Sequence, residues 1–251
     1  MAKANPDSVF SLASRLANRM NSLDLSQERI DEVMKSGDPF WPRFDAAILN
    51  IDSGVMKDLE NRVTTRTKDT EAQIKAWEKF YSEFFSLDFK FDAALIPQRQ
   101  SGFNRLIIIP QGMSISKAFA ACKQHFKCWK HTDEDLESVM RESERGPVKE
   151  TTSRWFRDRV EADEEVQGKS ANDLECEKIE GITLLERIIF ELKYWSETKK
   201  HLDVSNVTLC SGSRCSGGSV PYAYWYVDEF SVRWDDADSR NSILRSRVAV
   251  G

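Results

Sequence analysis

The sequence predicts an α+β fold, with a helical N-terminal region over residues 1–95 and a mixed α+β domain over 96–251. Two patterns support this prediction. Apolar residues recur at helical spacing in the first region and again over 183–201. Residues 202–250 instead hold short β-branched and aromatic runs separated by turn residues. In the second domain we therefore expect a small, mainly antiparallel sheet that packs on one long amphipathic helix.

The N-terminal region contains apolar stripes that are typical of amphipathic helices. Ser8 and Ser26 are placed to cap the first two helices, and Gly37 stands where the second would end. The clearest stripe begins near Thr70, and its aromatic side chains are expected to pack into a core, with a groove for a partner helix as the alternative. Its members are Ile74, Trp77, Phe80, Tyr81, Phe84 and Phe85.

After Pro97 the sequence pattern changes from helical spacing to a short strand followed by a helix. The β-branched run over 105–109 predicts a buried strand, and Gly112 then turns the chain. Ser114 is placed to cap a helix that continues to Phe126. A strand, a tight turn and a helix in this order form half of a βαβ unit. The N-terminus of this helix is a candidate anion site, because the first N–H groups of a helix have no partner within it.

The helix over 183–201 is the strongest in the sequence. Thr183 and Glu186 have the spacing of a capping box, and Lys199 to His201 place positive charge at the negative end of the helix dipole. Charged residues interrupt the apolar face, so this helix is expected in the core rather than in a membrane. They are Glu186, Arg187, Glu191 and Lys193.

The C-terminal part is expected to form strands. Runs over 207–210, 222–227 and 230–234 have strand character, and the last two are joined at Asp228-Glu229 as a hairpin. The Ser/Gly-rich segment 211–219 is expected to be a loop.

The composition is that of a soluble globular protein. The chain has 251 residues, of which 40% are hydrophobic and 31% charged, and its mean hydropathy is −0.52. It lacks an apolar run of about 18 residues and a signal peptide at its start. The five cysteines form no Cys-x-x-Cys pair, which favours reduced thiols. We therefore expect a cytoplasmic protein without membrane association.

Charge is distributed unevenly. The net charge of −5 argues against general binding of nucleic acid, yet residues 93–132 contain six basic residues and no acidic one. Residues 133–180 contain 16 acidic and 8 basic residues, so the two segments either face each other or carry solvated charge. Alternatively, the basic–aromatic segment 117–131 binds an anionic partner, because bases beside aromatic rings suit single-stranded nucleic acid. The candidate contacts are Lys123, Lys127, Trp129 and Lys130.

Four residues of types that bind zinc recur at every third position: Cys122, His125, Cys128 and His131. On one continuous helix they would extend over about 13 Å, which is too far for one tetrahedral ion. We therefore expect core or surface thiols and solvated histidines, with a metal site as the minor alternative.

The segment 158–165 is dense in carboxylates. If it is helical, Asp158, Glu161 and Glu165 share one face, with Asp163 nearby. Such carboxylates can hold Mg²⁺ for phosphodiester cleavage. The same spacing also suits a solvated surface with one ion pair.

The Ser/Gly loop is the best local candidate for ligand binding. Its glycines allow backbone N–H groups to converge, and Ser211, Ser213, Arg214 and Ser216 add hydroxyl and guanidinium donors suited to a carboxylate or phosphate. A flexible hairpin loop is the alternative. An acyl nucleophile is not expected, since no Gly-x-Ser-x-Gly elbow is present.

Segments 155–163, 182–187, 200–203 and 208–214 together resemble an uncharacterised bacterial protein family. The likeness covers roughly the last 150 residues. It implies a bacterial cytoplasmic origin and brings no activity, cofactor or catalytic residue with it.

Three hypotheses for the function follow. The first is a non-enzymatic binding or accessory module for a protein or a small anionic ligand, because no paired catalytic groups are visible. The second is a metal-dependent hydrolase or nuclease that uses the 158–165 cluster. The third is nucleic-acid binding through 117–131. No cofactor is predicted, and the oligomeric state is left open.

Overall fold

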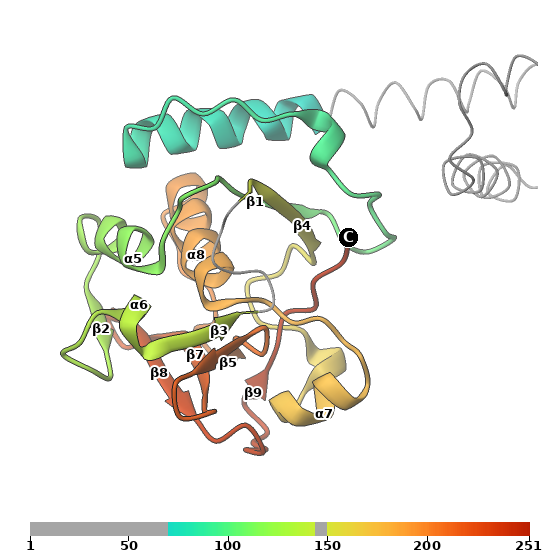
Figure 1. Cartoon of the computed structure of the whole chain (residues 1–251), viewed down its shortest axis with the longest axis vertical. Coiled ribbons are helices and arrows are strands. Elements are labelled where there is room, and N and C mark those ends of the chain that lie inside the picture. Colours follow the sequence, from blue (N-terminus) through green and yellow to red (C-terminus); the bar gives the residue numbers. More distant parts are fainter. Residues whose placement is uncertain (1–69, 144–149) are drawn as a thin grey trace, which may run out of the picture. The chain divides into compact units, whose positions relative to one another are not determined.

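The computed structural model of the protein describes residues 70–143 and 150–251 (Figure 1). The expected helices that begin at Ser8 and Ser26 lie outside the described residues. Besides a helix over 70–85, the helical elements are η1 (Ala93–Leu95), α5 (Ile115–Lys123), α6 (Leu136–Val139), η2 (Glu164–Val166), α7 (Ala171–Cys176) and α8 (Leu184–Thr198). The strands are β1 (Arg105–Ile109), β2 (Cys128–Lys130), β3 (Met140–Ser143), β4 (Thr152–Phe156), β5 (Val207–Leu209), β6 (Ser213–Cys215), β7 (Val220–Tyr226), β8 (Glu229–Asp235) and β9 (Leu244–Arg245).

A five-stranded mixed sheet is the main β structure, in the order β2-β8-β7-β5-β9. Its three central strands are antiparallel, and the edge strands β2 and β9 run parallel to their neighbours. Two smaller antiparallel pairs, β1-β4 and β3-β6, complete the described strands. The α+β prediction is confirmed.

Helix α8 lies at the centre of the core. It begins as predicted, because Thr183 Oγ1 accepts a hydrogen bond from Glu186 N, and Glu186 Oε2 accepts one from Thr183 N. It ends at Lys199, which has a left-handed backbone. The helix contacts both β1 and β7 (Figure 1). Its apolar face is buried in one cluster with residues of both sheets, which include Leu106, Ile108, Ala223, Phe230 and Val232.

The aromatic stripe of helix 70–85 belongs to the same core. Trp77 Nε1 donates a hydrogen bond of 3.1 Å to the carbonyl of Leu106, and Tyr81 Oη donates one of 2.5 Å to the carbonyl of Ile108. Both rings are at most 2% exposed. The indole and phenol groups thus satisfy carbonyls of β1 that would otherwise be buried without partners. The prediction that this stripe packs into a core is confirmed, and residues 73–251 form one compact unit.

The structure corrects three expectations about the connections. Strand β1 and helix α5 are not half of a βαβ unit, because β1 pairs antiparallel with β4, whereas β2 joins the five-stranded sheet. The β7–β8 hairpin turns at Val227 and Asp228, one residue earlier than predicted. The segment 211–219 also contains strand β6, which pairs with β3. In the described part of the chain, no helix combines the length and the apolar character needed to span a membrane.

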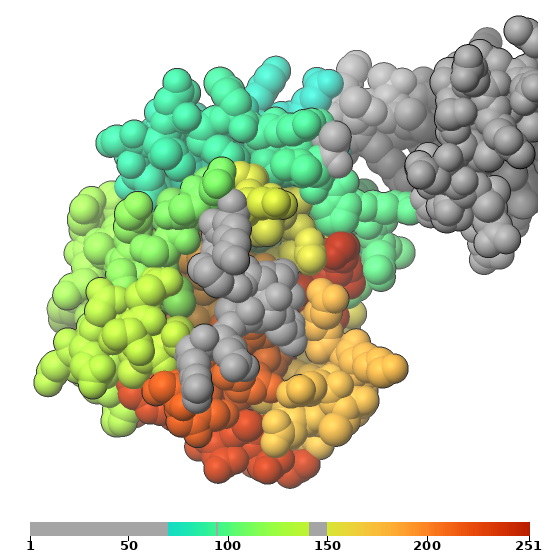
Figure 2. Space-filling model, in the orientation of Figure 1, coloured from blue at the N-terminus to red at the C-terminus, as the bar shows by residue number. Residues whose placement is uncertain are grey.

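The C-terminal segment crosses the core and holds distant elements together. Val250 forms a pair of backbone hydrogen bonds with Trp155, and Ala249 N donates to the carbonyl of Glu180. The last residue, Gly251, lies against Pro97, and Figure 2 shows this end of the chain at the surface. The segment thereby places the side chain of Arg247 in the interior, where it is 1% exposed.

Candidate functional site

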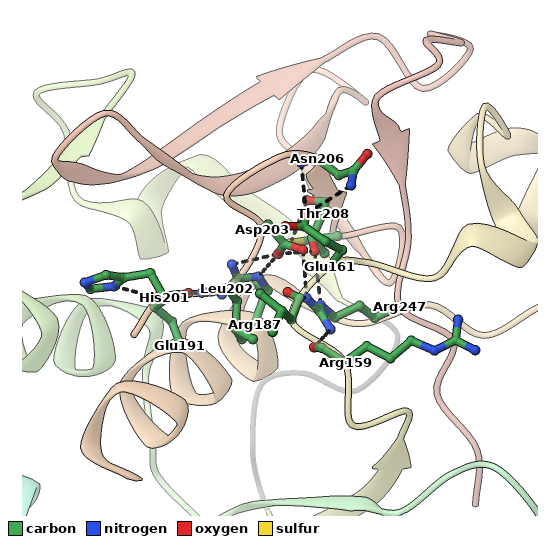
Figure 3. A network of polar contacts seen from close by, with 12 residues as sticks. Arg159, Glu161, Arg187, Glu191, His201, Leu202, Asp203, Asn206, Thr208 and Arg247 are labelled. Atoms are coloured by element: carbon green, nitrogen blue, oxygen red, sulfur yellow. Dashed lines mark hydrogen bonds and ion pairs between the residues drawn. The ribbon is translucent and has the colours of Figure 1, made fainter. Parts of the chain in front are cut away.

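Among the described residues, a buried network of polar contacts surrounds Asp203 (Figure 3). It contains two arginines and two carboxylates, Arg187, Arg247, Glu191 and Asp203, each at most 1% exposed. The residues come from α8, from the turn that follows it, and from the C-terminal segment. Four full charges in the interior are costly unless each is paired and hydrogen-bonded.

Asp203 is the centre of this network. Its Oδ1 accepts a hydrogen bond of 2.7 Å from Arg247, and its Oδ2 accepts one of 2.9 Å from Nε of Arg187 and one of 2.5 Å from Thr208 Oγ1. Its backbone has a left-handed conformation with φ of 54°. Aspartate tolerates this conformation better than most residues do.

Glu191 extends the network toward the surface. Its Oε2 accepts a hydrogen bond of 2.8 Å from Arg187, and its Oε1 lies 2.9 Å from Nδ1 of His201. The His201 ring stacks on Trp225 with centroids 3.3 Å apart. His201 is the partly exposed member of this group, with 17% of its side chain accessible.

The charges within the network are balanced. Burial acts to lower the pKa of Arg187, but Asp203 and Glu191 outweigh it and raise that pKa further above its usual range. Arg187 therefore stays charged between the two carboxylates. Arg247 also donates to the carbonyls of Arg159 and Val160, at 3.0 and 2.7 Å. With every charge engaged by the chain itself, the network connects α8 to the C-terminal segment, and we interpret it as structural.

The four residues expected as minor metal candidates are dispersed. Cys122 is buried in α5, and His125 packs against Phe84 and Trp195. Cys128 lies on β2, where burial raises the pKa of its thiol to about 12, and His131 contacts Trp234. Within the described ranges, no group of three or more His, Cys, Asp or Glu side chains is arranged to hold a metal ion.

The carboxylates of segment 158–165 also diverge, because the segment is a turn after β4 rather than a long helix. Those expected to hold a metal are instead engaged by groups of the chain, and Arg157 contacts both Asp163 and Glu165. Asp158 pairs with Arg105 at 2.9 Å, Asp163 with Arg157 at 2.7 Å and Glu165 with Arg159 at 2.8 Å. Glu161 accepts hydrogen bonds from the backbone N–H groups of Ser205 and Asn206.

The loop residues expected to bind a ligand are mostly engaged inside the fold. Ser213 Oγ accepts a hydrogen bond of 3.0 Å from Leu184 N and so caps α8. Ser211 Oγ lies 2.9 Å from Ser246 Oγ. Ser211 Oγ also lies so close to Gly181 that a Cβ added to this glycine would be 1.7 Å from it.

The rest of the loop is more open. Arg214 donates to the carbonyl of Ser211 at 2.6 Å and pairs with Glu175 at 2.9 Å. Ser216 is exposed, and its N–H donates to the carbonyl of Val139. Most of the donors that were expected to bind an anion in this loop therefore already have partners within the protein.

The candidate anion site at the start of α5 is filled in the same way. Ser114 caps the helix as predicted, with its Oγ accepting from Lys117 N at 3.2 Å. A carboxylate oxygen of Glu137 then accepts a hydrogen bond of 2.9 Å from Ile115 N. The helix N-terminus does bind an anion, but the anion is a side chain of the same protein.

The basic–aromatic segment is only partly available. Lys127 pairs with Asp228, and Lys130 donates to the carbonyl of Glu134. Lys123 is exposed, as is Trp129 with 37% of its surface accessible.

Three tyrosines alternate along β7 and were not predicted as site residues. Tyr222, Tyr224 and Tyr226 have ring centroids 6.0 and 5.9 Å apart. Because successive side chains of a strand point to opposite faces, all three lie on one face of the sheet. Trp129 lies on the same face, since Ser231 is paired with both Trp129 and Tyr224. We call these four residues the aromatic face. The Tyr-x-Tyr-x-Tyr alternation is the sequence signal that could have identified it.

The two faces of the sheet differ in how they are covered. Ala223, Phe230 and Val232 face the main core with α8. On the opposite face, Ala171 of α7 packs with residues of β5, β7 and β9 in a smaller cluster, which Tyr222 and Tyr224 only border. Tyr226 remains 53% exposed. The uncovered part of this face therefore lies toward β8 and β2.

Arginine and an exposed valine accompany the aromatic face. The guanidinium of Arg233 lies 4.7 Å from the centre of the Trp129 ring. At the hairpin tip, Val227 is 81% exposed and has φ of 56°, a conformation that is strained for a β-branched residue.

Comparison with protein-family models, with curated proteins and with solved structures finds no match for this chain.

Proposed function

We propose that this protein is a non-enzymatic binding module that contacts a partner protein through the aromatic face. The observation that supports the proposal best is the alignment of Trp129, Tyr222, Tyr224 and Tyr226 on one partly open face of the five-stranded sheet. Tyrosine and tryptophan offer large rigid contact areas at a low entropic cost, which is why they dominate the binding energy of many protein interfaces.

The strained hairpin tip gives independent support. Glycine or asparagine would adopt the backbone of Val227 with less strain, and a polar residue would suit its exposure. An apolar β-branched side chain at 81% exposure has no packing role in the described part of the chain. Val227 directly follows Tyr226 at the hairpin tip, and an exposed apolar side chain beside the aromatic face is what a contact residue would provide.

Charge on this face favours a protein over a polyanion. Arg233 contributes one positive charge, and Glu229 and Asp235 on the same face contribute two negative charges. Lys127 and Lys130 are already engaged by Asp228 and by the backbone of Glu134. A surface of mixed sign and slight negative charge lacks the clustered cations that bind nucleic acid.

As part of the same proposal, the protein acts in a reducing compartment such as the cytoplasm. All five cysteines lie in described segments, and all five are free thiols. Three of them, Cys122, Cys210 and Cys215, are buried in the core, where they behave as small apolar side chains.

The test compares tagged full-length variants incubated with an extract of the source organism. Tyr226→Ser removes an exposed ring from the aromatic face, and Ile243→Ser removes a side chain of similar exposure at 48% from another place. We expect quantitative mass spectrometry to find at least one protein that is retained by the wild type and by Ile243→Ser. Tyr226→Ser should lose it about ten-fold. Equal recovery by both variants would contradict the proposal.

A further inference from the structure

We infer that the partner adds an extended strand to the outer edge of β2 and places a β-branched or aromatic side chain against Trp129. The inference rests on the proposed function and deepens it by naming the kind of segment that is recognised. It depends on three observations: the two edges of the five-stranded sheet differ, β2 directs backbone groups outward, and Trp129 lies exposed between them.

The two edges of the five-stranded sheet are treated differently by the chain. At β9, Gly168 N donates a hydrogen bond of 2.9 Å to the carbonyl of Leu244. Asp163 N donates one of 3.0 Å to the carbonyl of Ser246, so the chain's own backbone covers this edge. At β2 the sheet order ends, and no other described strand pairs with its outer side. An edge strand presents main-chain donors and acceptors that can pair with another chain.

The register of β2 fixes which of its backbone groups point outward. The carbonyl of Lys127 accepts a hydrogen bond from β8, and His131 N donates one to β8. In a parallel pair, alternate residues of a strand bond to the same neighbour. Trp129 therefore also bonds to β8, whereas the N–H and C=O groups of Cys128 and Lys130 point to the outer edge. An added strand can bond to these groups without disturbing the pairing of β2 with β8.

The usual protection of an edge strand is missing from β2. Proline, bulges and outward-pointing charges commonly keep such strands from pairing. This strand contains no proline, and its register with β8 has no bulge. The amino groups of the nearby lysines are engaged by the chain itself, since Lys130 donates to the carbonyl of Glu134 and Lys127 pairs with Asp228.

Trp129 selects the side chain that the added strand brings. It lies between the two outward-pointing residues and is 37% exposed. If the added strand is antiparallel, Cys128 and Lys130 form the hydrogen-bonded pairs, and Trp129 stands opposite a residue of a non-hydrogen-bonded pair. Side chains approach most closely in such pairs, with Cα atoms about 4.5 Å apart. Aromatic rings pair favourably there with β-branched or aromatic side chains.

Peptide titration with the full-length protein tests this inference. The probe is a fluorescein-labelled pool of decapeptides in which threonine alternates with valine, isoleucine, phenylalanine or tyrosine, with lysine at both ends. A matched pool carries N-methyl groups on consecutive central peptide nitrogens, which removes main-chain donors from both edges of the peptide. We expect saturation with the first pool below about 1 mM and binding about ten-fold weaker with the methylated pool. Equal binding of the two pools would overturn the inference, as would the absence of saturation.

Substitutions at one position connect the signal to the edge. Lys130→Pro removes an outward N–H donor and keeps the hydrogen bonds to β8, because an edge strand tolerates proline where its N–H faces away from the sheet. Lys130→Ala is the matched control, since it removes the same side chain and keeps the N–H. We expect Lys130→Pro to weaken binding of the first pool about ten-fold relative to Lys130→Ala. Equal binding by the two variants would contradict strand addition.

Amide hydrogen exchange followed by NMR gives a readout that needs no substitution. In the free protein we expect slow exchange at Trp129 N and rapid exchange at the N–H groups of Cys128 and Lys130. Saturating peptide should slow the latter two at least about ten-fold. Unchanged exchange would overturn the inference. Protection that rises with protein concentration in the absence of peptide would also overturn it, because a second copy of the chain would then pair with β2.

The Lys130 pair also separates this inference from the proposed function. In the extract experiment, we expect the partner that depends on Tyr226 to be retained by Lys130→Ala and lost about ten-fold by Lys130→Pro. A partner that depends on Tyr226 but is retained equally by both Lys130 variants would overturn strand addition and leave the binding module intact. Peptide pairing at β2 without any partner that depends on Tyr226 would instead overturn contact through the aromatic face.

Discussion

Asp203 and Arg247 form a buried ion pair, with Oδ1 of the aspartate 2.7 Å from Nη2 of the arginine. The two residues lie 44 positions apart in the chain, and neither is more than 1% exposed. Because Arg187 binds the other carboxylate oxygen, Asp203 connects helix α8 to the C-terminal segment. Removal of one member of such a buried group leaves the others without compensation.

Asp203→Asn should therefore destabilise the protein strongly. Asparagine has nearly the same size and adopts positive φ readily, so the substitution removes the charge without adding backbone strain. Two buried arginines would then face the single carboxylate of Glu191. We expect the free energy of unfolding in urea to fall by about 3–5 kcal/mol.

The matched control for this prediction is Asp158→Asn. Asp158 also pairs with an arginine, Arg105 at 2.9 Å, but 40% of its side chain is exposed. Exposed ion pairs contribute about 0–1 kcal/mol. If the two substitutions have equal effects on stability, Asp203 is not the centre of a buried network.

Ser213→Ala tests the structural role of a loop residue that was expected to bind a ligand. The substitution leaves the buried N–H of Leu184 without its acceptor at the start of α8. We expect a loss of about 1–3 kcal/mol in the free energy of unfolding. The exposed Ser216 is the matched control, and Ser216→Ala should change stability by less than about 0.5 kcal/mol. Equal stability of Ser213→Ala and the wild type would restore Ser213 as a candidate for ligand contact.

Val227→Asn should stabilise the protein while it weakens partner binding. The left-handed backbone at this position costs a β-branched residue about 1–2 kcal/mol, which asparagine largely avoids. Val204→Asn makes the same exchange at an exposed valine that does not have a positive φ, so it should not raise the melting temperature. The melting temperature distinguishes the two variants. A decrease for Val227→Asn would show that the valine is required by the fold rather than by a contact.

An element of this fold can be predicted from the sequence when the residues that determine it lie within one short stretch of the chain. The bounds of α8 follow from Thr183 and Glu186 at one end and Lys199 at the other, which act within a few residues of the chain. Strand β1 follows from its continuous β-branched run, and the helix over 70–85 follows from the helical spacing of its aromatic residues. These elements were predicted because their signals are contained in one stretch of sequence.

Charged residues of α8 show where such reasoning fails. Arg187, Glu191 and Lys193 interrupt an apolar pattern, yet all three are buried. Their partners are brought close by the fold, since Lys193 Nζ donates to the carbonyl of Ala76, 117 residues away. The same limit applies to the loop and to segment 158–165, whose donors and carboxylates are taken up by distant groups. No periodicity within one segment predicts such pairing.

Asp173 is expected to cause part of the loss of stability of the protein in acid. Hydrogen bonds from Arg240, and then from Ser170 N, hold the pKa of this carboxyl well below its usual range. A lowered pKa in the folded state adds stability at pH values above the unfolded pKa of about 3.9, and that contribution is lost as the pH falls toward the folded value. We expect the free energy of unfolding to decrease less between about pH 4 and pH 2 in Asp173→Asn than in the wild type.

Arg240→Gln provides the control, because it removes the main cause of the shift and keeps the carboxyl. Its pH dependence over the same range should also be shallower than that of the wild type. If Arg240→Gln retains the steep decrease, another group is responsible for it.

Thiol labelling tests the burial pattern across the fold with one reagent. Cys176 is exposed at the end of α7, whereas Cys122, Cys210 and Cys215 are at most 5% exposed. Cys128 is the informative case, because it is only partly buried but burial raises the pKa of its thiol to about 12. At pH 8 only about one in ten thousand such thiols is the reactive thiolate. We therefore expect dithiobis(nitrobenzoate) to modify one thiol per chain rapidly, and all five after denaturation in guanidinium chloride.

Cys176→Ser should abolish the rapid phase, and Cys128→Ser should leave it unchanged. A second rapid thiol that disappears in Cys128→Ser would mean that the edge strand β2 opens in solution. Trp129 would then not be held in register with Ser231 and Tyr224, and the aromatic face would lose the tryptophan at its edge. The labelling result therefore bears on the proposed contact surface as well as on the packing of the thiols.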